Sequence, residues 1–400
     1  MRLSNRFQRP NNETLLLLTL AAIKFVHIMD FMVIMPLGPM LMDKLKINSQ
    51  QFGFLVSSYA LSAFLTSFWG IFRLDFYDRK KVLLVAFIGF LIGTTSCALG
   101  STYHLLLVAR FVTGAFGGIL ASTVLSIVGD TIPTERRGYG LSIVMSSFSV
   151  AAVFGVPFGL IAADKFGWQA PFFAVILMSM PVFWLLIKFI PSLKSHIKTI
   201  RVTPKITDIV ESGNQVRALS LCLLLVLSQF CIIPYISPFL VTNIAFPQSN
   251  LAYIYLFGGT ATFVTAPIIG RVSDKLGKPK TLQYAILASL VPIFLLTNLF
   301  PIDWRLVFVI TTLFFIFISG RMIPATAIAV STVPASKRGS FMSLQNALIQ
   351  LATFLATSIS AKILYNDQQG FLINYNLIGA ISICIGLIVF MLSKNVKVTN

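Results

Sequence analysis

Three ionisable side chains, Lys24, His27 and Asp30, recur at three-residue steps inside an otherwise apolar stretch near the start of the chain. Steps of three residues place them on one broad face of a helix. A carboxylate in a segment that crosses a bilayer costs a few kcal/mol, so such residues usually face a cavity and bind ions or protons. We therefore predict that Asp30 is a proton site. The alternative is an acid with a purely structural hydrogen-bonding role. His27 is either a proton relay or a hydrogen-bonded interior histidine.

A second charged residue, Arg110, lies inside another apolar stretch. The stretch Thr14–Leu41, which holds Asp30, and the stretch Tyr103–Ile127 are expected to cross the bilayer in opposite directions, and counting along each puts the two residues at similar depth. We predict that Asp30 and Arg110 pair when no proton is bound and that protonation loosens the pair. The alternative is an ion pair with a purely structural role. Arg321 either binds an anionic substrate or extends to the cytoplasmic interface.

The elements that must position these residues are membrane-spanning helices. Of the 400 residues, 56% are hydrophobic and 11% charged, whereas a soluble domain is about a quarter charged. Apolar stretches of about 20 residues, enough for a helix to cross the hydrocarbon core, are expected at Thr14–Leu41, Gln51–Phe72, Val82–Gly100, Tyr103–Ile127, Tyr139–Ala163, Trp168–Ile190, Ala218–Thr242, Leu251–Gly270, Leu282–Leu299, Leu306–Val330, Phe341–Leu364 and Phe371–Leu392. The predicted class is an all-α integral membrane protein with twelve transmembrane helices.

The basic residues predict the orientation of the chain. Most of the 31 Lys and Arg fall in loops on one side of the predicted topology, and cytoplasmic loops carry such an excess. Both termini are therefore expected in the cytoplasm. The net charge of +18 reports this topology and an attraction to anionic lipid headgroups, so it requires no nucleic-acid partner.

Two motifs indicate an internal duplication. Thr131–Gly138 has a counterpart in Thr332–Gly339, and Asp75–Lys81 has one in Asp274–Lys280. Both pairs are separated by about 200 residues, which is the signature of parallel repeats in transporters that bind solutes between the repeats. We predict two pseudo-symmetric six-helix halves around a central cavity, residues 1–190 and 218–400, joined by a cytoplasmic linker at residues 191–217.

These motifs give the chain a resemblance to the major facilitator superfamily, and most to its twelve-span bacterial drug- and sugar-efflux branch. The loop signature of the superfamily, Gly-x-x-x-Asp-x-x-Gly-Arg-Lys, is matched closely in the second half by Gly270, Asp274, Gly277 and Lys278. In the first half Asp75, Arg79 and Lys80 match, but Asp78 replaces the second glycine. Arg110 and Gly114 match the fourth-span signature, and Gly155, Pro157 and Gly159 partly match the helix-bend motif of proton antiporters.

The resemblance implies roles for further residues. Seven charged residues at the expected cytoplasmic helix ends would form a gate of ion pairs: Asp75, Arg79, Asp130, Arg136, Arg137, Asp274 and Lys278. Gly270, the glycine of the loop signature, belongs to the same predicted gate. Determination of topology is the alternative for the basic members, but it does not account for the acidic ones. The polar residues expected along the cavity are Gln229, Tyr235, Asn346 and Gln350.

The resemblance implies a secondary transporter, and we expect proton-coupled efflux of small hydrophobic or cationic compounds, or of sugar-like metabolites, by alternating access. A proton-coupled uptake symporter for a polar metabolite is the alternative. An enzyme or receptor is not expected, because the sequence shows no nucleotide loop, zinc pattern or nucleophile constellation, and no cofactor or metal is implied. The expected setting is a monomer in the lipid bilayer of the inner membrane, and its expected partners are protons and a small-molecule substrate.

Overall fold

The computed structural model describes residues 10–133, 136–194, 197, 206–334 and 338–396. The N half contains α1 (Pro10–Val33), α2 (Gly38–Leu45), α3 (Ser49–Arg73), η2 (Leu74–Phe76), α4 (Arg79–Leu99), α5 (Tyr103–Thr131), α6 (Arg137–Val150), the π-helical turn η3 (Ala151–Gly155), α7 (Val156–Phe166) and α8 (Ala170–Phe189). The short helix α9 (Ile206–Ile209) belongs to the expected linker, of which residues 195–196 and 198–205 lie outside the described part.

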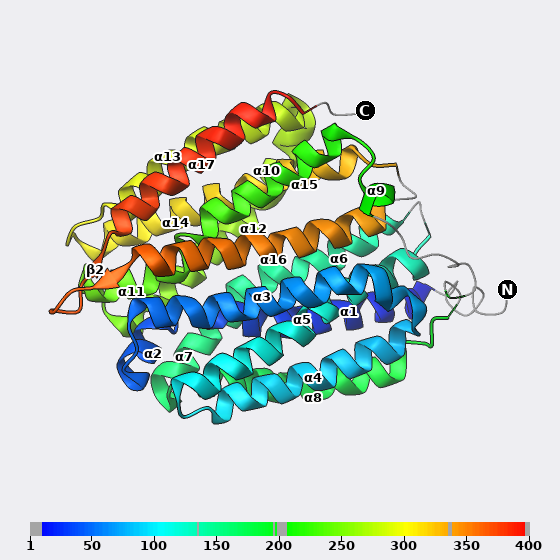
Figure 1. The fold of residues 1–400 in the computed structure, drawn as a ribbon, viewed down its shortest axis with the longest axis horizontal. Helices are drawn as coiled ribbons and strands as arrows, with labels where there is room; N and C mark the ends of the chain where they lie inside the picture. Colours follow the sequence, from blue (N-terminus) through cyan, green and yellow to red (C-terminus); the bar gives the residue numbers. More distant parts are fainter. Residues whose placement is uncertain (1–9, 134–135, 195–196, 198–205, 335–337, 397–400) are drawn as a thin grey trace.

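The C half contains α10 (Gly213–Phe230), η5 (Ile233–Tyr235), α11 (Ile236–Thr242), η6 (Gln248–Asn250), α12 (Leu251–Leu276), α13 (Lys278–Thr297), α14 (Trp304–Gly320), α15 (Met322–Ser331), α16 (Arg338–Ile363) and α17 (Tyr375–Ser393). A two-stranded antiparallel hairpin, β1 (Tyr365–Asn366) and β2 (Leu372–Ile373), joins α16 to α17. The N half and the C half form two bundles that meet where α3 lies beside α16 (Figure 1).

The helical stretches bear out the twelve predicted spans. Within the described residues, 11 stretches are long and apolar enough to cross a membrane. Four of them join shorter elements, such as α6, η3 and α7 in Arg137–Phe166. The remaining expected span, Phe341–Leu364, is occupied by α16, whose many Ser, Thr, Asn and Gln residues make it more polar than the others.

The start of α1, the end of α17 and α9 lie at one end of the molecule, which we call the inner end, while α2, α11 and the hairpin lie at the opposite, outer end (Figure 1). Buried apolar residues form one cluster near the outer end that draws on both halves, including Leu41, Phe52, Tyr235 and Tyr375. A second cluster belongs to the N half alone. A third belongs to the C half and adds Ile71 of α3. The two halves therefore share the first cluster towards the outer end, and α3 also packs into the cluster of the C half.

Polar caps and one glycine fix several helix ends. Asn48 and Gln51 form a reciprocal capping box at the start of α3, which satisfies backbone N–H groups that a helix leaves free. Gly277, at the junction of α12 and α13, has φ +89°, a conformation that glycine adopts without steric cost. Asp78 occupies the corresponding place in the N half with φ −61°, so the aspartate there is not strained.

Asp78 also connects the start of the linker to α4. Its carboxylate accepts hydrogen bonds from the Lys80 amide (3.0 Å), from the Ser192 hydroxyl and from the Leu193 amide (2.9 Å). Burial would raise the pKa of Asp78, but these hydrogen bonds and the charge of Lys194 outweigh burial and lower it. A depressed pKa means that the bonds stabilise the fold above the ordinary aspartate range, about pH 4, and are lost as the pH falls below it.

We expect Asp78→Ala to destabilise the protein by about 0.5–2 kcal/mol, the range for loss of a helix N-cap, and to release the segment that follows α8. Trypsin should then cut between the halves, after Lys194, faster than in the wild type. Thermal unfolding and limited proteolysis of purified protein measure the two effects. Asp43→Ala, which removes an exposed carboxylate at the outer end, is the matched control. Equal cleavage rates in both variants would contradict the anchoring role.

Candidate functional site

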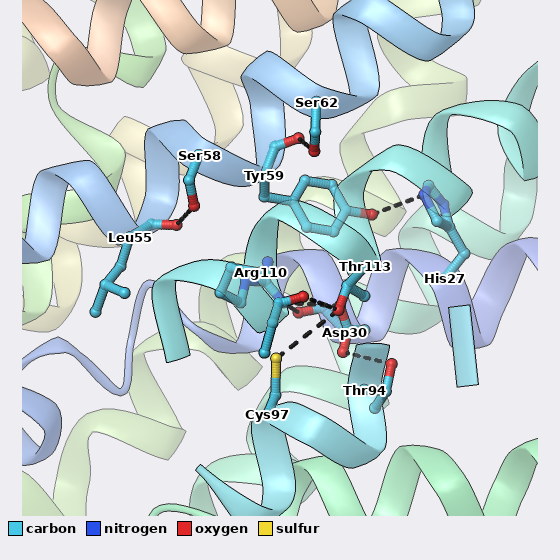
Figure 2. A network of polar contacts seen from close by, with 11 residues as sticks. His27, Asp30, Leu55, Ser58, Tyr59, Ser62, Thr94, Cys97, Arg110 and Thr113 are labelled. Carbon is cyan, nitrogen blue, oxygen red and sulfur yellow. Dashed lines mark hydrogen bonds and ion pairs between the residues drawn. The ribbon is translucent and has the colours of Figure 1, made fainter. Parts of the chain in front are cut away.

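The first candidate site is a buried ion pair between α1 and α5. Arg110 Nη1 donates to Asp30 Oδ2 over 2.8 Å, and both side chains have 0% exposure. The same nitrogen lies 3.4 Å from the backbone oxygen of Asp30, and Thr94 of α4 donates to Asp30 Oδ1 over 3.2 Å. The structure therefore brings the two residues into contact, with donors on both carboxylate oxygens (Figure 2).

Tyr59 of α3 joins this pair to His27. The Arg110 guanidinium carbon lies 4.4 Å from the centre of the Tyr59 ring, a favourable cation–π distance. The Tyr59 hydroxyl is 2.9 Å from His27 Nε2. The result is a row of contacts from His27 through Tyr59 and Arg110 to Asp30 (Figure 2). His27 Nδ1 and Arg110 Nε and Nη2 have no hydrogen-bond partner among the described residues.

Close helix approaches at glycine hold this row together. A Cβ atom on Gly114 of α5 would lie 2.3 Å from the Tyr59 backbone oxygen, and one on Gly93 of α4 would lie 2.8 Å from the Thr113 backbone. Small residues at such crossings let membrane helices pack at short backbone distance. Because α3 and α4 both approach α5 this closely, Tyr59 and Thr94 can reach the ion pair from opposite sides.

Burial makes this pair costly to disrupt. Removing one partner of a buried ion pair leaves an uncompensated charge and typically costs about 3–5 kcal/mol. A proton on Asp30 would remove its charge and weaken the bond to Arg110 without removing any atom. The arrangement can therefore couple the protonation of one carboxyl group to the packing of α1 against α5.

The second candidate site is a cavity of about 490 Å³ between the two halves, within the usual range for small-molecule sites, about 300–1,000 Å³. Most of its wall is apolar, including Phe31, Phe148, Phe230 and Phe315. The polar and charged residues in the wall are Lys24, His27, Ser149, Gln229, Tyr255, Thr262, Thr265, Ser319, Thr326, Gln345, Asn346, Gln350 and Thr353. No Asp or Glu is among the described residues that line it.

Three of the four predicted cavity residues, Gln229, Asn346 and Gln350, line this cavity, and Tyr235 does not. Tyr235 is fully buried at the outer end, where its hydroxyl donates to the backbone oxygen of Ser49 over 3.2 Å. Its placement in the cavity was wrong because η5 interrupts the helix at Pro234 and directs the ring towards the N half. Asp30 and Arg110 also lie outside the cavity wall, which they reach through Tyr59 and His27.

Sequence reasoning did not single out Tyr59 or Thr94 for the ion-pair site. A tyrosine or threonine in an apolar span has no distinctive pattern, so only the packing at Gly93 and Gly114 reveals their roles.

Arg321 was predicted either to extend to the interface or to bind substrate, yet it has 0% exposure. Its guanidinium donates to Ser228 Oγ (3.1 Å), Leu225 O (3.3 Å) and Ser289 Oγ (3.4 Å) inside the C half, so it does not extend to the interface.

The predicted bend motif lies at an irregular turn. The π-helical η3 ends at Gly155, and α7 begins with Val156 and Pro157. Gly155 and Gly159 face Met29 and Val33 of α1, where added Cβ atoms would lie 3.2 Å and 2.8 Å from side-chain carbons. π-helical turns occur frequently at functional sites, and this one adjoins the helix that carries Asp30.

The predicted gate residues form ion pairs within the N half. Arg79 Nε contacts Asp130 Oδ2 at 3.0 Å, and Arg136 Nη2 contacts Glu13 Oε2 at 3.0 Å, a partner that sequence reasoning did not include. Arg137 Nε has no hydrogen-bond partner among the described residues. The side chain of Asp75 lies outside the described part. The remaining predicted members stand at the inner end of α12 and the start of α13: Gly270, Asp274 and Lys278.

Hydrogen bonds between the two halves occur at the outer end. The Ser49 amide donates to Asn366 Oδ1 over 2.8 Å, and Tyr235 donates to the Ser49 carbonyl. Also, α12 packs mainly on η3 and α7 and much less on α6. Within the described part of the chain, no ion pair crosses between the halves. The hydrogen bonds between the two bundles therefore lie at the outer end, and α12 packs less closely on the inner part of the N half than on the outer part.

Comparison with known proteins places this architecture in a family. The family pattern of the Major Facilitator Superfamily matches residues 20–357 and again residues 218–397. The chain belongs to the Major Facilitator Superfamily. It is thus a transporter and not an enzyme, in agreement with the expectation from the sequence.

Two relatives in this superfamily come from Bacillus subtilis (strain 168). The uncharacterized MFS-type transporter YceJ is 25% identical over 356 residues, 88% of this chain and 89% of YceJ. The uncharacterized MFS-type transporter YtbD is 29% identical over 272 residues, 66% of each chain.

Two solved structures share the fold of this superfamily member. The nucleoside transporter NupG, in a mutant form, superposes with a TM-score of 0.71 at 12% identity, covering 95% of this chain and 99% of NupG. A bacterial homologue of the human lysosomal transporter Spinster, in an inward-facing and unoccupied conformation, gives 0.70 at 14% identity, covering 98% of this chain and 99% of that one. At these identities the likeness concerns the fold alone.

Proposed function

We propose that the protein is a proton-coupled antiporter that exports small amphipathic molecules by alternating access, with Asp30 as its proton site. The observation that carries the proposal is the fully buried Asp30–Arg110 pair, which is linked through Tyr59 to a histidine in the cavity wall. Ionisable residues inside membrane spans typically mark ion or proton pathways. No equivalent carboxylate is present among the described residues that line the cavity.

In the proposed cycle, Asp30 without a proton holds α1 to α5 through Arg110. A proton that arrives from the outside neutralises Asp30, loosens the pair and permits the halves to rock about the cavity. The charged residues of the inner end, which include the Arg79–Asp130 and Arg136–Glu13 ion pairs, act as the gate on that side. Uptake by symport requires the same parts and differs in the direction of substrate movement relative to the proton.

The proposed setting is a monomer in the cytoplasmic membrane with both termini on the cytoplasmic side. The cavity is formed within one chain, so a second copy is not needed to complete it. The concentration of Lys and Arg in loops on one side supports this orientation. The start of α1 and the end of α17 lie at the same end of the molecule (Figure 1).

Transport by purified protein in proteoliposomes with an imposed pH gradient tests the proposal. The panel contains amphipathic cations, neutral compounds, anions and sugars. We expect the wild type to move substrate against the proton flow. We expect Asp30→Asn to lose gradient-driven movement by at least about a hundredfold, since proton-transfer groups contribute about 10²–10⁴. Asp303→Asn, at a surface N-cap of α14, is the control that should behave as the wild type.

The sign of the coupling separates the two transport modes. Substrate movement in the same direction as protons would replace antiport by symport while keeping Asp30 as the proton site. Transport that ignores the gradient and survives Asp30→Asn would contradict proton coupling altogether.

A further inference from the structure

The cavity wall contains a cation, Lys24, that has no counter-charge among the described residues. Lys24 lies on α1, half-buried in the cavity wall, and no acceptor or carboxylate among the described residues contacts its ammonium group. A charge at mid-span is costly and is usually paired or functional. The nearest carboxylate on the same helix, Asp30, is already bound to Arg110.

A second uncompensated cation lies behind the opposite wall. Arg321 separates α14 from α15, and its neighbours Gly320 and Met322 line the cavity while its own side chain is buried against Ser228 and Ser289. Its hydrogen-bond partners are neutral hydroxyl and carbonyl oxygens, and no carboxylate of the described chain pairs with it. One positive charge therefore comes from each half.

These charges determine which ligands the cavity favours. Interactions between charges are much stronger in a low-dielectric interior than in water, and walls that carry one sign of charge concentrate ligands of the opposite sign. A cationic substrate would meet Lys24 and find no carboxylate in the described wall. An anion would supply the missing counter-charge of Lys24.

The other residues of the cavity wall indicate the chemistry of the uncharged part of the ligand. Phenylalanines from both halves, such as Phe31 and Phe315, offer an apolar surface for a ring or an alkyl chain. Gln229 Oε1 and Asn346 Nδ2 are buried without a hydrogen-bond partner in the described residues, so each can bind a polar group of the ligand. Buried polar atoms normally have a hydrogen-bond partner, and a ligand can supply one here.

Building on the proposed transport function, we infer that the substrate of this cavity is an amphipathic organic anion whose carboxylate or comparable acidic group binds Lys24 and whose apolar part lies among the phenylalanines. The amides of α10 and α16 bind its neutral polar groups. Lys24 is the specificity-determining residue, and Arg321 adds to the positive field from the C half.

Three dansyl probes that share one fluorophore test the inference. Dansylglycine is an anion, its primary amide is neutral, and dansylcadaverine is a cation. Each is titrated against the full-length protein in lipid nanodiscs, with empty nanodiscs as the blank. We expect dansylglycine to bind roughly tenfold or more tightly than the other two, a modest effect for a charge pair in a desolvated site.

Variants at position 24 assign the preference to the lysine. Lys24→Met keeps the length of the side chain and removes its charge, so the preference for the anion should disappear while binding of the neutral amide persists. Lys24→Arg should retain the preference. A wild type that binds the three probes alike, favours the cation or leaves dansylglycine unbound would overturn the inference, as would an undiminished preference in Lys24→Met.

The binding assay needs no gradient, so it separates this inference from the transport proposal. Selective binding of dansylglycine together with transport that ignores pH would retain the anion site and reject proton coupling. Proton-driven transport that depends on Asp30 but treats the three probes equally would retain the coupling and reject the anion site.

Discussion

Arg110→Met should strongly reduce the amount of folded, monodisperse protein at neutral pH, and adding Asp30→Asn should recover most of it. The single variant leaves the Asp30 carboxylate fully buried with Thr94 as its remaining side-chain donor. Breaking a buried pair in this way costs about 3–5 kcal/mol. The double variant buries no charge at this position, and neutral replacements of buried ion pairs are often well tolerated.

The pH dependence of the two single variants should differ. A proton can neutralise the carboxylate that Arg110→Met leaves behind, so its thermal unfolding temperature should approach that of the wild type as the pH is lowered. The guanidinium that Asp30→Asn leaves behind keeps its charge at every accessible pH, so its stability should show no such recovery. The double variant should fold yet fail to couple transport to protons.

Size-exclusion profiles and unfolding temperatures in detergent, measured from about pH 5 to pH 8 around the usual stability range, test this prediction. An Arg110→Met protein that is as stable as the wild type at pH 8 would show that the pair does not carry the expected charge. Arg305→Met, at the outer start of α14, is the matched control for loss of an exposed arginine.

Gly114→Ala should destabilise the protein, whereas Gly129→Ala on the same helix should not. A Cβ atom at position 114 would lie 2.3 Å from the Tyr59 backbone oxygen, while nothing lies within 4 Å of the corresponding position at Gly129. Backbone atoms cannot rotate away, so α3 must separate from α5. Overpacking of this kind costs about 1–3 kcal/mol and occasionally more.

The same substitution at Gly129 should be neutral or stabilising, because alanine is favoured over glycine inside a helix by about 1 kcal/mol. Comparing unfolding temperatures of the two variants removes the effect of helix propensity. Gly114→Ala should also weaken proton-driven transport, since the Tyr59 ring would no longer lie between Arg110 and His27. Equal stability of the two variants would show that the α3–α5 contact is looser than the structure has it.

The sequence was sufficient to predict the twelve spans, since their length and apolar composition are dictated by the bilayer. It also indicated the contact of Asp30 with Arg110, because position along two antiparallel helices fixes depth. It was insufficient for Tyr59 and Thr94, whose roles depend on helix rotation and on the close approaches at Gly93 and Gly114. It misplaced Tyr235, because rotation after the break at Pro234 is decided by packing at the outer end.

The loop motifs also show contacts that the sequence alone could not predict. The close match around Gly277 lies at a junction that uses positive φ, whereas the imperfect match around Asp78 holds the segment after α8. Where Asp78 replaces the glycine of the loop signature, the residue therefore has a different role: it binds the segment after α8. No spacing rule applied to the sequence would have indicated that Asp78 contacts residues more than a hundred positions away.

The wall of the cavity, with Lys24 and without a carboxylate in its described part, also bears on the electrical character of the proposed exchange. An anion that leaves the cell while one proton enters would move two elementary charges in the same electrical direction. Each charge that crosses the membrane gains about 2.3 kcal/mol per 100 mV. The membrane voltage would then drive both the exit of the anion and the entry of the proton. Export could therefore continue in cells whose internal and external pH are equal.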